Sequence, residues 1–194
     1  DYTFFSEKKN YQPYMIDLIK KIAEDNKVLY LSFDQNDKIN IHNVENLHLG
    51  NYLSRYFVFK NIKTKFFLLT MTDLGNSFLK KSKNVKYYVH FFHAPVSAHK
   101  QFTNKAFNNY DIVFANGVYQ IQELRELEKI NNSKKKEIYP TGYMYFDYLS
   151  KIEKKKHEDF ILFAPSWSYS KNNCLDKYGF KILSKLIEQN YKVI

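Results

Sequence analysis

Three of the six histidines lie within ten residues of one another, at His90, His93 and His99. A zinc site is the first chemistry to consider, because imidazole is a common zinc ligand. His90 and His93 would point to opposite faces of a strand, since side chains along a strand alternate with a period of two. No cysteine or carboxylate lies close in the sequence to complete a ligand set. We therefore expect no metal site at these histidines.

His93 is better suited to acid–base chemistry. The apolar run before it should end at this residue, because Pro95 biases Ala94 towards an extended conformation. A histidine at a strand end, with a pKa near neutrality, can remove a proton from a hydroxyl nucleophile. The sequence therefore predicts His93 as a general base. We interpret His90 as an ordinary packing residue.

An anion site is predicted directly after this histidine. Ser97 can cap a helix that carries Phe102, Ala106 and Phe107 on its apolar side. The free amides at a helix start attract phosphate. His99 and Lys100 would add positive charge in the first turn, where a helix dipole alone does not favour it. We predict that Ser97, His99 and Lys100 contact an anionic substrate. For His99, an ordinary polar role fits equally well.

Four more candidates for substrate binding follow other predicted strands: Asp73, Gly117, Ser166 and Trp167. Asp73 can orient a substrate hydroxyl or a lysine, although a plain aspartate at a loop start fits as well. Gly117 provides the turn out of a strand. Ser166 and Trp167 can face a cleft between two domains, but a buried tryptophan is the commoner outcome.

Short apolar runs alternate with helical patterns along the chain. The runs that predict strands span residues 3–6, 27–33, 47–49, 65–71, 85–92, 111–115 and 137–139. Strand–helix alternation of this kind predicts an α/β fold, a Rossmann-like parallel sheet with helices on both faces. Ligands bind beyond the carboxyl ends of the strands in such sheets. The candidate residues above follow these strands, except Ser166 and Trp167, which follow a later predicted strand at residues 159–164.

The pattern also predicts a domain boundary. Residues 1–150 form the first α/β domain, and residues 151–158 are a charged linker with three consecutive lysines. Residues 159–194 then provide a strand, a helix and the start of another strand. We expect these residues to be the beginning of a second α/β domain that the chain leaves incomplete.

The composition narrows the class of protein. The chain is 44% hydrophobic, which excludes a disordered protein, and its net charge of +10 favours anionic partners. Cys174 is the single cysteine, so no disulfide forms within the chain, as expected in a reducing compartment. No signal peptide and no apolar run of about 20 residues is present. We expect a protein that is soluble or attached to a membrane surface.

Several catalytic motifs are absent from the sequence. It contains neither the G-x-G-x-x-G fingerprint of dinucleotide-binding proteins nor the phosphate-binding loop of ATPases. The G-x-S-x-G elbow of the α/β-hydrolases is also absent. These absences disfavour a dehydrogenase, a P-loop ATPase and a hydrolase, and we expect no cofactor.

The motifs together resemble those of a known family. The ordered series comprises LTMTDLG (69–75), LKKS (79–82), KYYVHFFHAPVSAH (86–99), AFNNYD (106–111), GVYQIQE (117–123), GYMYFD (142–147) and ILFAPSW (161–167). This series is similar to that of the CDP-glycerol:poly(glycerophosphate) glycerophosphotransferases and their teichoic-acid and capsule relatives. The resemblance covers residues 65–167.

The resemblance implies a GT-B architecture, in which two Rossmann-like domains face a cleft. It implies transfer of glycerol or ribitol phosphate from a CDP-linked donor to an anionic polymer or lipid-linked acceptor. The reaction would take place at the cytoplasmic face of the cell membrane, with His93 as the base. Family members often have Gly-Thr after this histidine, where this chain has Ala94 and Pro95. Their second catalytic histidine would lie beyond Ile194, so the chain alone should be inactive.

Two other functions stay open from the sequence. A GT-B glycosyltransferase that uses a nucleotide sugar would share the fold. A non-catalytic basic module for an anionic polymer, lipid or nucleic acid would carry its charge on one continuous face. Of these ligands, we do not expect nucleic acid.

Overall fold

The computed structural model describes residues 1–76, 79–152, 159–165 and 174–194. The chain divides into two compact units, Asp1–Ile152 and Glu153–Ile194. The predicted linker at 151–158 lies mostly outside the described residues, and Ser166 and Trp167 lie outside them entirely.

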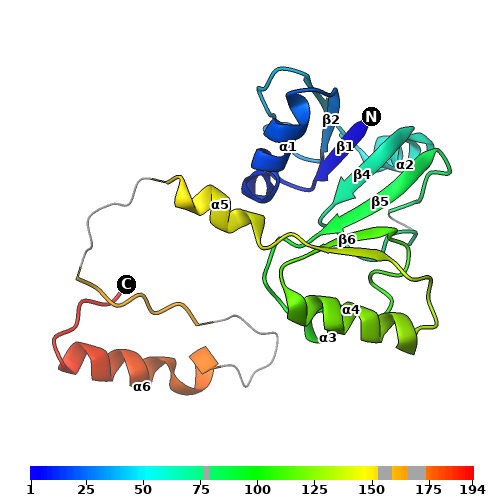
Figure 1. The fold of residues 1–194 in the computed structure, drawn as a ribbon. Coiled ribbons are helices and arrows are strands. Elements are labelled where there is room, and N and C mark those ends of the chain that lie inside the picture. Colours follow the sequence, from blue (N-terminus) through cyan, green and yellow to red (C-terminus); the bar gives the residue numbers. More distant parts are fainter. Residues whose placement is uncertain (77–78, 153–158, 166–173) are drawn as a thin grey trace. The chain divides into compact units, whose positions relative to one another are not determined.

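The first unit is built on one seven-stranded sheet (Figure 1). Its strands are β1 (Tyr2–Ser6), β2 (Val28–Ser32), β3 (Val44–His48), β4 (Thr64–Leu69), β5 (Val85–Phe91), β6 (Ile112–Ala115) and β7 (Glu137–Pro140). The strand order is β3-β2-β1-β4-β5-β6-β7, and every neighbouring pair is parallel. The prediction of a Rossmann-like parallel sheet is therefore confirmed.

Helices connect these strands. They are the 3₁₀ helix η1 (Lys9–Tyr14), α1 (Ile16–Ala23), α2 (Tyr52–Asn61), α3 (Ala98–Gln101), α4 (Val118–Ile130) and α5 (Met144–Ser150). Ile19 and Ala23 of α1 join one buried cluster, whereas Phe59 of α2 and Leu124 of α4 join another. The helices thus cover both faces of the sheet, as expected for a parallel sheet.

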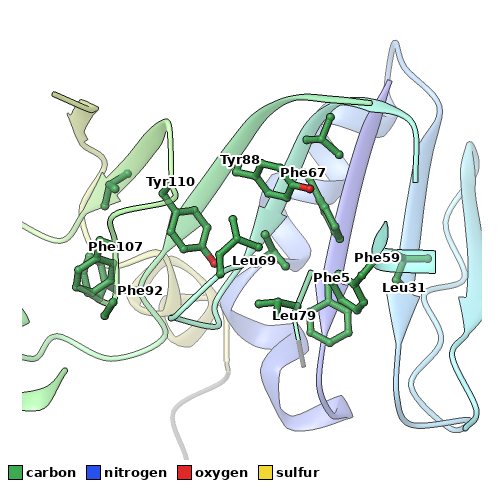
Figure 2. Close-up of a cluster of buried hydrophobic side chains, with 14 of the residues drawn as sticks. Phe5, Leu31, Phe59, Phe67, Leu69, Leu79, Tyr88, Phe92, Phe107 and Tyr110 are labelled. Carbon is green, nitrogen blue, oxygen red and sulfur yellow. The ribbon is translucent and has the colours of Figure 1, made fainter. Parts of the chain in front are cut away.

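Aromatic side chains make up a large part of the larger of the two cores (Figure 2). Phe59 is completely buried, and its ring lies 5.1 Å from that of Phe5 and 5.6 Å from that of Phe67. Aromatic pairs at these separations add to the free energy that burial of apolar area contributes. This core fixes α2 against β1 and β4.

The helix after Ser97 is shorter than the sequence pattern predicts. α3 has a single turn and ends before Phe102, although Ala106 and Phe107 are buried as expected. Residues 103–110 form successive turns instead of continuing the helix. The physical reason is a tertiary connection: Asp73 accepts from the Thr103 hydroxyl and donates its own amide to the Ala106 carbonyl.

The second unit contains α6 (Cys174–Glu188) and a short parallel pairing. Ile161 pairs with Val193, and the amide of Phe163 donates to the carbonyl of Ile194 at 2.9 Å. Two segments that we predicted as strands therefore lie side by side. In the part of the chain that the structure describes, no helix is long and apolar enough to cross a membrane.

Candidate active site

The strand order reverses between β1 and β4, which are neighbours although β2 and β3 separate them in the sequence. In parallel sheets, ligands bind beyond the carboxyl ends of the strands at such a reversal. The loop of Asp73 follows β4, and His93 follows β5, the next strand in the sheet. The topology therefore places these two predicted residues at the expected edge.

His93 packs against two tyrosines of η1, the helix that follows β1. Its ring lies 5.1 Å from the ring of Tyr11 and 6.1 Å from that of Tyr14, at interplanar angles of 84° and 71°. The hydroxyl of Tyr143 donates to the main-chain carbonyl of His93 at 3.0 Å. Half-burial lowers the pKa of the imidazole below its usual value. A neutral imidazole can accept a proton, as a general base must.

The loop after His93 is anchored by polar side chains that sequence reasoning missed. The Asn116 amide group donates to the carbonyl of Ala94 at 3.0 Å, and that of Gln120 donates to the carbonyl of Val96 at 2.7 Å. Gln120 is completely buried. Gly117, between them, is the N-cap of α4 and has an extended backbone. These contacts fix the direction in which the chain leaves β5.

Ser97 caps α3 as predicted, since its hydroxyl accepts from the amide of Lys100. The anion at this helix start belongs to the protein itself. Glu123 accepts from the Ser97 hydroxyl at 2.8 Å and from the Ala98 amide. His99 lies 2.9 Å from the Glu123 carbonyl. The groups that we expected to meet a substrate phosphate are thus engaged with α4, apart from the exposed side chain of Lys100.

Asp73 connects the loop after β4 to the turns at residues 103–110. Its carboxylate accepts from the hydroxyls of Thr72 at 2.9 Å and Thr103 at 3.0 Å. Its φ of 57° lies in the left-handed region, which aspartate tolerates better than most residues. The structure therefore gives Asp73 a connecting role at the edge where a substrate would lie.

His90 is completely buried behind His93. Its Nδ1 lies 3.1 Å from the carbonyl of Met71, and the rings of Phe92, Phe107 and Tyr110 lie 4.7 to 5.1 Å from its own. Burial lowers the pKa of His90 to about 3. This geometry agrees with a packing role, except that the buried Nε2 has no hydrogen-bond partner among the described residues.

The low pKa of His90 predicts how stability depends on pH. The unfolded chain would bind a proton near pH 6.5, whereas the folded protein would bind it only near pH 3. The contribution of His90 to stability should therefore fall as the pH drops from 6.5 towards 3, by at most about 1.4 kcal/mol per pH unit. Urea unfolding at several pH values measures this slope. The His90→Phe variant should have a smaller slope, and an unchanged slope would contradict the prediction.

Among the described residues, no group of three or more histidine, cysteine or acidic side chains is arranged to hold a metal ion. His90 and His93 both line one small cavity beside the end of β5.

No protein-family model and no curated protein matches this chain. Among solved structures, the chain is similar to the wall teichoic acid polymerase TagF, with a TM-score of 0.61 and 13% identity over 99% of this chain. A histidine-to-alanine variant of TagF matches with a TM-score of 0.59 and 13% identity over 98% of the chain. A TagF variant soaked with CDPG matches with a TM-score of 0.57 and 12% identity over the whole chain.

The chain spans 54% of the length of each of these three structures. At this identity the likeness establishes the fold. The similar structures belong to the group of enzymes that the sequence motifs resemble, so two separate comparisons agree on the architecture.

Proposed function

We propose that this chain is the amino-terminal part of a transferase that moves glycerol or ribitol phosphate from a CDP-linked donor to a teichoic-acid or capsule-type polymer. The observation that carries the proposal is the placement of His93. Its half-buried imidazole, with a lowered pKa, lies at the carboxyl edge beside the strand-order reversal. The TagF-like fold and the sequence motifs support the same reaction.

In this mechanism His93 removes the proton from a terminal hydroxyl of the acceptor. The hydroxyl oxygen attacks the phosphorus that carries the polyol, a new phosphodiester bond forms, and the bond to cytidine monophosphate breaks. Such a displacement depends on positioning and on stabilisation of charge rather than on covalent help from the protein. The rings of Tyr11 and Tyr14 provide part of the positioning, since they fix the plane of the imidazole.

Lys100 is our candidate for a contact with the donor phosphates, because its side chain is exposed beside the His93 loop. The other predicted substrate-binding residues of the first unit would help to position the substrate through the loops beside His93 that they connect. They are Asp73, Ser97, His99 and Gly117. Ser166 and Trp167 remain proposed contacts of the second unit. We take residues 159–194 as the beginning of the donor-binding domain of a GT-B enzyme, so the chain alone should not catalyse transfer. The whole enzyme would work at the inner face of the cell membrane.

Product analysis with the full-length protein tests this proposal. The protein is incubated with a polyol-phosphate acceptor and with CDP-glycerol, CDP-ribitol or a nucleotide sugar. The masses of the products are then measured by mass spectrometry. Growth by polyol-phosphate units supports the proposal. Growth by sugar units indicates a glycosyltransferase of the same fold. Binding to anionic polymer or vesicles without transfer indicates the non-catalytic basic module.

Tyr11 provides a prediction about the positioning of His93. Replacing Tyr11 by leucine removes the ring that packs edge-to-face against the imidazole, and we expect turnover to fall by roughly tenfold or more. Tyr11→Phe retains the ring and should keep most of the activity. Steady-state rates of the two variants check this expectation. Equal losses in both variants would show that the hydroxyl of Tyr11, and not its ring, is what the site needs.

A further inference from the structure

A small cavity lies beside His93, between the end of β5, the loop that follows it and α3. Its volume is about 70 Å³, room for roughly two water molecules or one hydroxymethyl group. Phe92, Val96 and Phe102 provide apolar walls. The polar side chains that line it are His90, His93 and Gln101.

The hydrogen bond of His90 fixes its protonation state. The Met71 carbonyl can only accept, so Nδ1 of His90 must carry the proton and donate to it. Nε2 is then a bare acceptor, and it is buried without a partner among the described residues. A buried acceptor without a donor costs roughly 1–3 kcal/mol, so this atom is available to a group that brings a donor.

The walls of the cavity restrict that group further. An ionised carboxylate or phosphodiester has no proton to donate to Nε2. Inorganic phosphate keeps a hydroxyl but, like them, would lose the hydration of its charge against Phe92 and Phe102. A neutral hydroxyl can donate to Nε2 and loses far less on desolvation. The cavity therefore favours an uncharged hydroxyl group over an anion.

We infer that the cavity lined by His90 and His93 is a subsite for a hydroxyl group of the acceptor polyol, which donates its hydrogen bond to Nε2 of His90. The inference rests on the proposed function and names the part of the substrate that the site recognises. A polyol end carries neighbouring hydroxyls: His93 takes the proton from one, and the hydroxyl next to it enters the cavity.

Entry of the hydroxyl requires a small movement of the wall. Nε2 is covered by its neighbours in this conformation, and most of the lining consists of packed aromatic and aliphatic side chains. Gln101 is the exposed member of the lining, at the end of the single-turn helix α3. We expect the hydroxyl to enter past this exposed side chain.

A pair of acceptors tests the inference with the full-length protein. One acceptor ends in a glycerol phosphate unit, and the other lacks the hydroxyl next to the nucleophile. The wild-type protein should use the second acceptor with a kcat/KM lower by about tenfold or more, because the site is built to hydrogen-bond the missing group. His90→Phe should use both acceptors equally. Tyr110→Phe is the control: the Tyr110 hydroxyl also donates to the Met71 carbonyl, but Tyr110 does not line the cavity. This variant should prefer the first acceptor over the second by the same factor as the wild type.

A second measurement covers the case in which His90→Phe does not fold. The full-length protein is labelled with ¹⁵N at histidine, and the Nε2 resonance of His90 is followed during addition of glycerol or of inorganic phosphate. Glycerol should shift this resonance, and phosphate should not. Equal use of both acceptors by the wild type, or a shift with phosphate alone, would overturn the inference. Failure of transfer from every donor would instead refute the proposed function, while the glycerol titration would still test the cavity.

Discussion

The His93→Ala variant of the full-length protein is expected to transfer polyol phosphate about 10²- to 10⁴-fold more slowly than the wild type. A general base contributes roughly this factor, because the acceptor hydroxyl is a poor nucleophile until its proton is removed. His93 is suited to this task, since burial lowers its pKa and its ring is held in place by Tyr11 and Tyr14. Steady-state turnover with CDP-glycerol measures the effect.

His42→Ala is the matched control for this experiment, because His42 is exposed and lies far from β5 in the sequence. This variant should keep wild-type turnover. Both variants should unfold at similar urea concentrations, which separates loss of chemistry from loss of structure. Turnover of His93→Ala within about tenfold of the wild type would remove His93 from the catalytic role.

Phe59→Ala should lower the free energy of unfolding by about 3–5 kcal/mol, the cost of removing a buried phenyl ring and leaving a cavity. Phe59 is completely buried, and its ring packs against Phe5 of β1 and Phe67 of β4. Figure 2 shows these three residues within the same cluster. The loss should appear as a lower midpoint in urea unfolding.

Phe57 provides a control of the same residue type in the same helix. Its side chain is 61% exposed, so Phe57→Ala should change stability by no more than about 0.5 kcal/mol. Similar losses in both variants would mean that α2 does not pack on the sheet through Phe59. A large loss of stability in Phe59→Ala alone would support the packing of α2 on the sheet through Phe59.

Much of the fold could be predicted because most strands carry their own local signal; the exposed strand β3 (Val44–His48), predicted at 47–49, does not. The run at 65–71 is almost continuously apolar, as expected of a strand covered on both faces, and it forms β4 in the middle of the sheet. The position of Pro95 correctly indicated that β5 ends before His93. Helix length was less predictable, because the tertiary bonds of Asp73 end α3 after one turn.

The partners of the site residues could not be predicted, because they come from distant parts of the sequence. Tyr11 and Tyr14 lie about eighty residues before His93 and reach it only because β1 and β4 are neighbours. Glu123 lies one helix away from Ser97, and its sequence position gives no sign that its carboxylate would accept from the Ser97 hydroxyl. Only the packing of the sheet and its helices brings these groups together.

A crystal structure of the full-length protein soaked with CDP-glycerol tests the central claim most directly. We expect the donor to bind at the carboxyl edge of the sheet, with the phosphorus that carries the glycerol facing the imidazole of His93. A donor bound at another edge, or a His93 ring turned away from the bound donor, would contradict the assignment of this site. The fold would then stand without the function that we propose for it.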